Sequence, residues 1–408
     1  MKILHFADLH IGVENYGRLN PETGLNSRLE DFLVGLDTIV DTALKEEVDL
    51  VLFAGDAFKI NEPSNTHQRV FAERIWRLSQ HGIPTFLLIG NHDQTNKYGE
   101  SHALDIYATL SIPNVHVSDR PGIYRISTRA GMLQIATMPH VSRSALMTHD
   151  DFAGRTLAEV DRSIVEQVEE ILQHFSHQLD PALPAILAAH VGVEQAKMGS
   201  EQTMSIGYGF TVPLGVIARP EYQYVALGHV HKHQVLCTDP LVIYPGSVER
   251  VDFGEEKEDK GFVIVELEPG LPARHTFVRL DGRRFLTLDV DLAGATDPTA
   301  ELLAEIEVAD IRGAIVRLMY TIPMSRAEEV DTPKIKAALE PAFYAVLRPI
   351  LEDPSERVRM PELSEATEFH PLQIFEKYLE RRDDLHGMQA DLLERAQQLW
   401  AKVQGEDG

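Results

Sequence analysis

The sequence predicts a layered α/β domain, and two observations carry that prediction. Short apolar runs recur along the first two thirds of the chain, and each ends at a polar or acidic cluster. Runs of roughly four to six such residues, bounded by turn signals, are typical of strands buried on both faces. Between the runs lie segments with helical spacing of apolar residues, and strand–helix alternation indicates a layered fold. The runs lie at 2–10, 48–58, 84–93, 184–192 and 222–231.

The segments between the runs give the remaining elements of this domain. Helices are predicted at 28–47 and 65–82, where the apolar residues form one stripe and Gly82 ends the second helix. The regions 113–137 and 240–267 have the pattern of strands joined by turns. We therefore expect either one mixed sheet or two sheets stacked as a sandwich.

The last third of the chain has a different organisation. The segment EPGLPAR marks a boundary near 270, and 284–350 has the pattern strand, helix, strand, helix, with the second helix over 332–348. Two amphipathic helices are predicted at 371–384 and 387–403, after a charged linker that contains proline. The expected divisions are 1–270 for the first domain, 275–350 for a small α+β unit, 351–369 for the linker and 370–404 for the helical segment.

Composition limits the classes of protein to which this chain can belong. It has 63 acidic and 38 basic residues, a formal net charge of −25 at pH 7. That is the wrong sign for a protein that grips nucleic acid over its whole surface, so any DNA contact must be local, metal-assisted or shared with a partner. Cys237 is the only cysteine, which excludes intrachain disulfides and thiolate metal sites. We expect a reducing, cytoplasmic setting, because we find neither a signal-peptide core nor the roughly 18 apolar residues of a membrane span.

Side chains that bind metals follow five of the predicted strands. In open α/β sheets, ligands bind beyond the carboxyl ends of the strands, so clusters from distant parts of the chain are expected to converge on one crevice. In the patterns Asp-Leu-His and His-Val-His the donors are two positions apart, and in extended backbone such pairs face the same side. The candidates are Asp8, His10, Asp56, Asn91, His92, Asp93, His190, His229 and His231.

The donor types indicate which metals would bind. Carboxylate, imidazole and one amide oxygen suit Mn²⁺, Fe²⁺ or Zn²⁺ better than Mg²⁺ or Ca²⁺, which prefer oxygen. The set is too large for one tetrahedral ion and suits two octahedral ions with a bridging carboxylate. Two ions about 3.5–4 Å apart activate a water and hold phosphate oxygens for in-line displacement. His92, next to Asn91, is then a candidate general acid or a group that orients the phosphate.

Structural interpretations compete with each single motif. A lone Asp-x-His or a lone surface histidine is structural in most proteins, and only the ordered set, each member behind its own strand, is specific for a dinuclear site. We expect His233, which has no partner motif, to be exposed or to support a ligand rather than to be one. Structural roles are assigned to His140, His149, His174 and His177, and solvated helix positions to Asp105 and Asp161.

The ordered set resembles the calcineurin-like metallophosphoesterase superfamily. The resemblance implies a four-layered α/β/β/α fold and a two-metal phosphoester hydrolase, and leaves the substrate open because the fold serves several chemistries. The segments ILHFADLHIG, NSRLEDF, YVALGHVHKHQ and YPGSVERVDFGEEKEDKGFVIVEL, within 1–267, are similar to SbcD-type DNA double-strand-break repair nucleases. In that family a capping domain follows, to which 275–350 corresponds, and a C-terminal helical segment docks an SbcC-type ATPase. HPLQIFEKYLERRDDL, within 370–404, is similar to that segment.

The resemblance also implies roles for the candidates. Asp8, His10 and His231 would hold one ion, and Asn91, His190 and His229 the other. Asp56 would bridge the ions, and His92 would be the catalytic histidine. The resemblance further implies Mn²⁺ as the activating ion, 3′-to-5′ exonuclease activity on double-stranded DNA, and endonuclease activity on single strands and hairpins. It implies a homodimer through nuclease-domain helices, here 65–81 and 101–110.

One position departs from the family pattern. Some relatives carry His or Asp three residues after the bridging aspartate, where this chain has Lys59. A protonated lysine cannot ligate a metal but attracts phosphate, so we expect Lys59 to contact phosphate or to lie on the surface. The polar loop after the first ligand pair, with Asn26 and Arg28 at its end, either lies over a phosphate backbone or is simply solvated. The candidate DNA contacts are Arg18, Asn20 and Lys59.

Two alternatives to a DNA repair nuclease stay open. The acidic charge fits a hydrolase of the same superfamily that acts on nucleotides or other small phosphoesters, although such an enzyme has little use for a cap and two trailing helices. The apolar face of those helices favours a scaffold that bridges an ATPase to DNA, a role compatible with a nuclease. The competing interpretation is that these helices pack on the cap.

Overall fold

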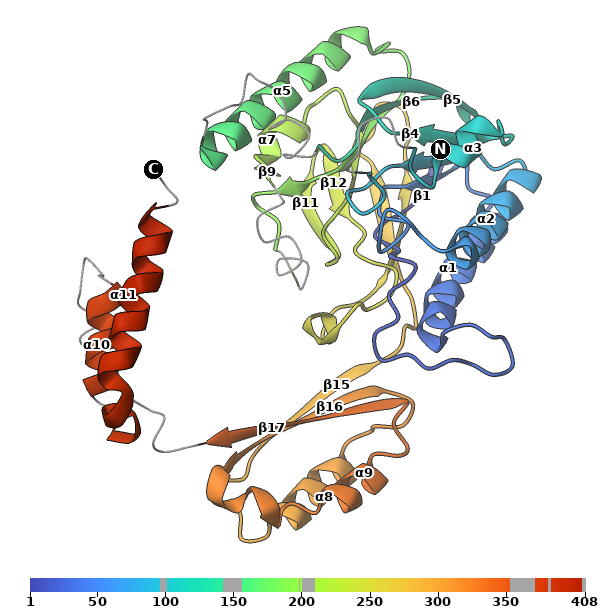
Figure 1. The fold of residues 1–408 in the computed structure, drawn as a ribbon. Helices are drawn as coiled ribbons and strands as arrows, with labels where there is room; N and C mark the ends of the chain where they lie inside the picture. The colour runs from blue at the N-terminus through green and yellow to red at the C-terminus, as the bar shows by residue number, and fades with distance from the viewer. Residues whose placement is uncertain are drawn as a thin grey trace. The chain divides into compact units, whose positions relative to one another are not determined.

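The computed structural model describes residues 1–95, 101–141, 156–197, 199, 210–352, 371–380 and 383–405 (Figure 1). It divides into two compact units, which are described separately. The first comprises Met1–Leu288, Ala309–Leu318 and Leu339–Val346, and the second Asp289–Val308, Met319–Ala338 and Leu347–Gly408. His149 and nearly all of the predicted linker at 351–369 lie outside the described residues. The four divisions expected from the sequence stay a prediction.

The first unit contains two six-stranded mixed sheets. In the first sheet the strand order is β14-β13-β1-β2-β3-β4. Strands β1 to β4 run parallel to one another, whereas β13 is antiparallel to both β1 and β14. The bounds are β1 Lys2–Phe6, β2 Leu50–Phe53, β3 Thr85–Leu88, β4 Val115–Ser118, β13 Gly261–Glu266 and β14 Arg274–Arg279.

The second sheet has the order β11-β12-β10-β7-β6-β5. Its four central strands are parallel, and the edge strands β11 and β5 are antiparallel to their neighbours. The bounds are β5 Gly122–Thr128, β6 Gly131–Met138, β7 Ala185–His190, β10 Tyr224–Gly228, β11 Gln234–Thr238 and β12 Leu241–Tyr244. A separate two-stranded sheet joins β8 (Gly192–Val193) to β9 (Thr211–Val212).

Alternation along the central strands separates three apolar cores. In β2, Val51 and Phe53 pack with the apolar residues of α1 and α2, whereas Leu52 packs between the two sheets. In β7, Ile186 faces that inter-sheet core and Leu187 packs with α5 and α7. Successive side chains on a strand point to opposite faces, so each central strand contributes to two cores. The layers are therefore helix, sheet, sheet and helix, which confirms the predicted α/β/β/α fold (Figure 1).

The helices of the first unit begin at recognisable caps. The side chain of Asn26 caps α1 and that of Ser64 caps α2, which confirms the predicted helices near 28–47 and 65–82. Helix α5 was not predicted from the sequence, although Thr156 and Glu159 form a capping box at its start. The bounds are α1 Ser27–Lys45, α2 Asn65–Gln80, α3 Asp105–Thr109, α5 Leu157–Gln178 and α7 Leu214–Ile217.

The strands that follow form a third sheet in the order β15-β16-β17, with bounds Phe285–Asp291, Ile315–Pro323 and Tyr344–Glu352. The helix predicted over 332–348 is wrong in its second half. Helix α9 covers only Thr332–Ala338, and β17 begins at Tyr344. Pro341 has no amide hydrogen for a helix and disfavours helical backbone at the preceding residue, so the chain turns and pairs as a strand.

The second unit contains helices and part of this third sheet. Helix α8 (Pro298–Val308) and α9 lie against each other, burying Leu302, Ile306 and Ile335. The 3₁₀ helix η3 covers Met324–Glu329. The predicted C-terminal helices correspond to α10 (Pro371–Glu380) and α11 (Gln389–Gly405), joined by the 3₁₀ helix η5 (Asp383–Met388). Among the described residues, none of the helices has the length and apolar character needed to span a membrane.

Candidate metal centre

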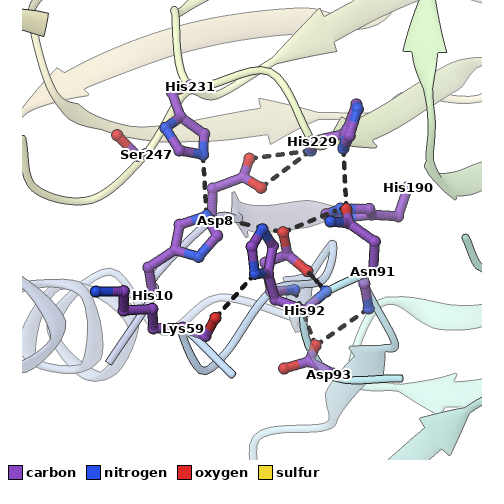
Figure 2. Close-up of polar contacts among 12 residues, drawn as sticks. Asp8, His10, Lys59, Asn91, His92, Asp93, His190, His229, His231 and Ser247 are labelled. Atoms are coloured by element: carbon purple, nitrogen blue, oxygen red, sulfur yellow. Dashed lines mark hydrogen bonds and ion pairs between the residues drawn. The ribbon is translucent and has the colours of Figure 1, made fainter. Parts of the chain in front are cut away.

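The predicted ligands lie at or just beyond the carboxyl ends of strands from both sheets. Asp8 and His10 follow β1, Asp56 follows β2, and Asn91 follows β3 of the first sheet. His190 ends β7 of the second sheet, and His229 and His231 follow β10. Figure 2 shows the side chains that it labels among these, Asp8, His10, Asn91, His190, His229 and His231, pointing toward one another between the two sheets. The candidate donors therefore converge at the strand ends, where the strand-end rule expects a ligand to bind.

The backbone at these positions differs from the extended form expected from the sequence. Asp8, His10, Asp56 and His229 have φ angles of 52°, 47°, 62° and 102°, the left-handed region that side-chain-bearing residues rarely adopt. The strands end before these residues, and the chain turns sharply so that each donor points into the crevice. Such strain costs of order 1–3 kcal/mol per residue and is concentrated at functional sites. The same-side argument from period-two spacing was thus wrong in its mechanism.

One group of donors lies beyond the end of strand β1 in the first sheet. Ligand atoms of Asp8, His10 and His231 all lie within 4.8 Å of one another, and the Nε2 atoms of His10 and His231 are 2.9 Å apart. Asp8 also accepts the backbone amide of His229, at 3.0 Å to Oδ1. All three side chains are buried.

A second group gathers around the amide of Asn91. Its Oδ1 lies 2.9 Å from Nε2 of His190 and 3.0 Å from Nδ1 of His229. The two histidines that lie two positions apart, His229 and His231, thus lie in different groups of side chains.

Asp56 lies between the two groups. Its Oδ2 is 3.7 Å from Nε2 of His10 and 3.4 Å from Nε2 of His190. Its Oδ1 accepts the backbone amide of His92 at 2.8 Å. A single carboxylate that faces both groups has the placement that a bridging ligand requires.

His92 lies at the edge of the site and remains partly exposed. Its Nδ1 is 2.8 Å from the carbonyl oxygen of Lys59, and its ring centroid is 4.9 Å from that of His10. Donation from Nδ1 to that carbonyl leaves Nε2 as the nitrogen available to a substrate.

Glycines in the motifs make room for this convergence. A Cβ built on Gly90 would collide with the carboxylate of Asp56, and one on Gly228 would collide with the carbonyl oxygen of Ala54. That carbonyl accepts the Nδ1 hydrogen of His190 at 2.7 Å. The glycines of the patterns Gly-Asn-His-Asp and Gly-His are therefore required by close packing around the donors.

Burial sets the protonation of most donors. It lowers the pKa values of His10 and His229 well below the usual range, so both imidazoles are neutral and have a free lone pair. Burial also raises the pKa of Asp8 to about 7. Burial alone would raise the pKa of Asp56, but the charges of His190 and His92 hold it well below its ordinary value.

Three residues at the centre have roles that the sequence did not predict, although Asp93 was a candidate donor. Asp93 turns away from the donors and accepts backbone amides of Asp56 at 2.9 Å, Ala57 at 3.0 Å and Gly90 at 3.1 Å, so it holds the loops that carry the donors. Glu255 lies 2.7 Å from Nδ1 of His231. No local pattern marks it, although it lies in the segment that supported the family resemblance.

His140, expected to be structural, is the third. Its ring lies 6.0 Å from that of His229 and 6.3 Å from that of His190. Burial lowers its pKa to about 4, and its Nδ1 is buried without a hydrogen-bond partner.

The candidate DNA contacts lie in different surroundings. Lys59 is half-buried beside the donors. Arg18 lies over the ring of Tyr344, at 5.7 Å. The amide of Asn20 is occupied by the carboxylate of Glu30, at 2.9 and 3.0 Å. Arg28, which the sequence placed beside this loop, is fully buried and donates to Asp31, so it cannot face DNA.

The residues that were expected not to bind metal also have defined surroundings. His233 is half-buried, stacks on Phe277 with centroids 4.0 Å apart and lies 2.9 Å from the carbonyl oxygen of Tyr244, which fits its expected non-ligand role. His174 and His177 are exposed on α5. Asp105 was expected to be solvated, but it pairs with Nε2 of His102 at 2.9 Å. Asp161 is half-buried on α5.

The donor chemistry fits a pair of divalent cations. His190 and His231 each direct Nδ1 at a carbonyl or carboxylate oxygen, which leaves their Nε2 atoms directed at the crevice. The Nε2 atoms of His10 and His231 lie at hydrogen-bond distance, close enough to serve one cation. Carboxylates complete each group, and the described donors include no sulfur.

Comparison with known proteins agrees with this geometry. Residues 1–233 match the calcineurin-like phosphoesterase family. The chain is 26% identical over 370 residues to the DNA double-strand break repair protein Mre11 of Archaeoglobus fulgidus, covering 86% of this chain and 76% of that one. It is also 26% identical over 275 residues to the SbcD component of the nuclease SbcCD of Bacillus subtilis, covering 66% and 67%.

A solved structure of a dimetal phosphatase from Danio rerio is similar with a TM-score of 0.38 and 13% identity, covering 66% of this chain and 93% of that one. The family match spans more than half of the chain and includes the donors from Asp8 to His231. The chain therefore belongs to the calcineurin-like phosphoesterase family and is a metal-dependent phosphodiesterase with nuclease relatives.

Proposed function

We propose that this protein is the SbcD-like nuclease subunit of a DNA double-strand-break repair complex, which hydrolyses DNA phosphodiesters with two metal ions. The observation that carries the proposal is the pair of donor groups that share Asp56. Support for DNA as the substrate comes from the two relatives, whose names describe a break-repair protein and a nuclease.

Each of the site residues has a proposed role. Asp8, His10 and His231 would hold one ion, Asn91, His190 and His229 would hold the other, and both ions would share Asp56. The bound ions would supply an activated water and neutralise charge on the phosphate. His92 orients the scissile phosphate or gives a proton to the leaving oxygen through Nε2, because its Nδ1 is held by Lys59. Lys59 and Arg18 contact DNA phosphates, and Asn20 supports the loop of Arg18.

We take Mn²⁺ to be the activating ion. The donor set combines several imidazoles with carboxylates and one amide oxygen, which disfavours Mg²⁺ and Ca²⁺. The expected activities are 3′-to-5′ exonuclease on double-stranded DNA and endonuclease on single-stranded and hairpin DNA. A cytoplasmic setting is expected on the ground that Cys237 is the only cysteine.

The assembly we propose has two interfaces besides DNA. Residues 370–404 dock an SbcC-type ATPase, which gives a binding partner to the two C-terminal helices, where Leu399 is 61% exposed. A homodimer forms through helices near 65–81 and 101–110. The capping domain corresponds to 275–350.

The central test is a nuclease assay with purified protein, linear duplex DNA and Mn²⁺. The wild-type protein should degrade the DNA, and Asp56→Asn and His92→Ala should each abolish degradation. His174→Ala, on the exposed face of α5, is the matched control and should leave the rate unchanged. Full activity in either site variant would refute the assignment.

A second assay separates DNA from small phosphoesters. Turnover of a chromogenic phosphodiester is compared with turnover of plasmid-length DNA at equal Mn²⁺. A preference for the small ester would favour a nucleotide-type phosphodiesterase. Deletion of 369–408 tests the docking proposal, because co-purification of the ATPase with the truncated chain would contradict it.

A further inference from the structure

Glu255 lies at the end of a short 3₁₀ helix, η2 (Phe253–Glu255), and is fully buried. Its Oε1 is 2.7 Å from Nδ1 of His231. Its Oε2 accepts the backbone amide of Val251 at 2.9 Å and pairs with Nζ of Lys260 at 2.9 Å. Both oxygens of the carboxylate are therefore engaged, and one of them is aimed at a predicted metal ligand.

Lys260 fixes the same histidine from its backbone side. Its side chain is also fully buried, and Nζ donates to the carbonyl oxygen of His231 at 3.1 Å and to Glu258 at 2.9 Å. The amide of Ser247 donates to the same carbonyl at 2.9 Å. His231 is thus held at its ring by Glu255 and at its main chain by Lys260 and Ser247.

Neighbouring contacts keep η2 in place. Asp252 caps its first turn by accepting the amide of Gly254 at 2.7 Å. The ring of Phe253 packs on those of Phe285 and Tyr16, with centroids 5.0 and 5.3 Å apart. Because these contacts hold Asp252 and Phe253 in place, the neighbouring Glu255 has little freedom to move. Its position relative to His231 is therefore defined.

The charge of Glu255 decides which ring nitrogen of His231 can bind a metal. Oε2 of Glu255 lies 2.9 Å from the ammonium group of Lys260 and accepts the amide of Val251, so the carboxylate is an acceptor for Nδ1 of His231. Nδ1 of His231 must then carry a hydrogen, and Nε2, which faces His10, keeps its lone pair.

We propose that Glu255, charged and held by Lys260, is a positioning residue that selects the Nε2-binding tautomer and ring orientation of His231, and thereby sets the metal affinity of the group formed by Asp8, His10 and His231. This inference rests on the two-metal site proposed above but needs no particular substrate. It depends on the anionic acceptor that Glu255 offers to Nδ1 of His231 within hydrogen-bond distance.

The decisive variant is Glu255→Gln. The amide keeps the size of the side chain, but its neutral oxygen is drawn to Lys260, which turns the NH₂ group toward Nδ1 of His231. Nδ1 must then accept, the hydrogen moves to Nε2, and Nε2 can no longer ligate.

The matched control is Glu249→Gln. Glu249 is another buried glutamate in the same stretch of chain, and it accepts the backbone amides of Arg250 at 2.7 Å and Arg283 at 2.9 Å. It contacts none of the predicted ligands, so its variant reports the cost of neutralising a buried carboxylate in this region.

The measurement is a titration of each protein with Mn²⁺ alone, followed by the electron paramagnetic resonance signal of the free ion. Wild type and Glu249→Gln should bind two ions per chain with equal affinities. Glu255→Gln should bind one ion normally and the other about 10–100-fold more weakly, the range expected for loss of a residue that supports a ligand. Thermal unfolding is recorded alongside.

Each result has one meaning. Two ions bound by Glu255→Gln with wild-type affinities would overturn the inference, even if the variant were less stable than wild type. If Glu255→Gln does not fold, Glu255→Asp takes its place, since a shorter carboxylate cannot reach His231 and Lys260 together; wild-type Mn²⁺ affinity in that folded variant would equally overturn it. A wild-type protein that binds two Mn²⁺ ions without cleaving DNA would refute the proposed function and leave this inference standing.

Discussion

The Nε2 atoms of His10 and His231, 221 positions apart in the chain, lie 2.9 Å from each other. They approach from different sheets, His10 after β1 and His231 after β10. This contact therefore joins the two sheets of the sandwich at one point.

A double variant that lacks both His10 and His231 should bind as many Mn²⁺ ions per chain as either single variant. His10→Ala and His231→Ala should each reduce the Mn²⁺ stoichiometry from two to one, and the double variant should still bind one, because both side chains serve the same ion. Groups that act on one ion are not additive. His10→Ala with His190→Ala, one from each group, should bind none. Loss of both ions in the His10/His231 double variant would contradict the grouping, and equilibrium dialysis with metal analysis measures it.

Asp93→Asn should destabilise the loops under the site without removing a ligand. The carboxylate accepts backbone amides of Asp56, Ala57 and Gly90, whereas an amide turns one NH₂ group toward those donors. We expect a loss on the order of 1–3 kcal/mol, measured as a lower denaturant midpoint. Asp49→Asn is the control, because Asp49 accepts the amide of Lys2 at 2.7 Å in a less buried place. Equal midpoints for Asp93→Asn and wild type would contradict the role of Asp93.

His5 should make the protein sensitive to acid. Burial lowers its pKa from 6.5 to about 3, so below pH 6.5 the unfolded chain binds a proton that the folded chain excludes. Stability attributable to His5 is therefore unchanged above that pH and falls between pH 6.5 and 3 by up to about 1.4 kcal/mol per pH unit. The measurement is the unfolding free energy as a function of pH.

The test for His5 is a double variant. Its Nδ1 lies 2.6 Å from the hydroxyl of Tyr224, so His5→Leu with Tyr224→Phe removes both polar partners together and avoids an orphaned group. The double variant should have a shallower loss of stability below pH 6.5. His275→Leu, at an exposed position, is the control and should keep the wild-type slope. An unchanged slope in the double variant would be inconsistent with a neutral buried His5.

Trp76→Glu should disrupt the proposed homodimer. Helices α2 and α3 touch through Phe71 and Tyr107, whose rings are 6.1 Å apart, while Trp76, Ile106 and Leu110 are 47%, 48% and 62% exposed. Large apolar side chains exposed on adjoining helices are typical of an interface. Sedimentation should change from dimer to monomer in this variant, and Val308→Glu, on the exposed end of α8, should leave it unchanged. A monomeric wild type would exclude this interface.

Lys59→Ala should weaken DNA binding in a salt-dependent way. If Lys59 contacts one phosphate, its removal should reduce the slope of log affinity against log salt by about 1. Lys45→Ala, exposed at the end of α1, is the control. Affinity and salt dependence equal to wild type in Lys59→Ala would rule out the phosphate contact. Binding is measured by fluorescence anisotropy without divalent metal, so that cleavage does not interfere.

The sequence by itself predicted a layered α/β domain with candidate donors at the strand ends, and it left open one mixed sheet or two stacked sheets. Alternation in strands such as β2 and β7 assigns each side chain to one of two cores, because successive residues on a strand face opposite ways. The position of the donors after the strands also followed from sequence, since the carboxyl ends of parallel strands meet at one edge. The wrong prediction of a helix over 332–348 shows the limit of this reasoning, because the helical spacing of apolar residues was extended past Pro341.

The tertiary structure alone decided how the donors meet. The left-handed backbone of Asp8, His10 and Asp56 could not be predicted from spacing, because packing of the whole sandwich compensates for the strain. Glu255 and His140 carry no local signal, and Asp93, a candidate donor by its motif, accepts backbone amides instead, since these roles depend on which distant groups the side chains touch. Only the folding of two sheets against each other brings Nε2 of His231 to His10 and Nδ1 to Glu255, and that contact is a property of the fold rather than of any segment.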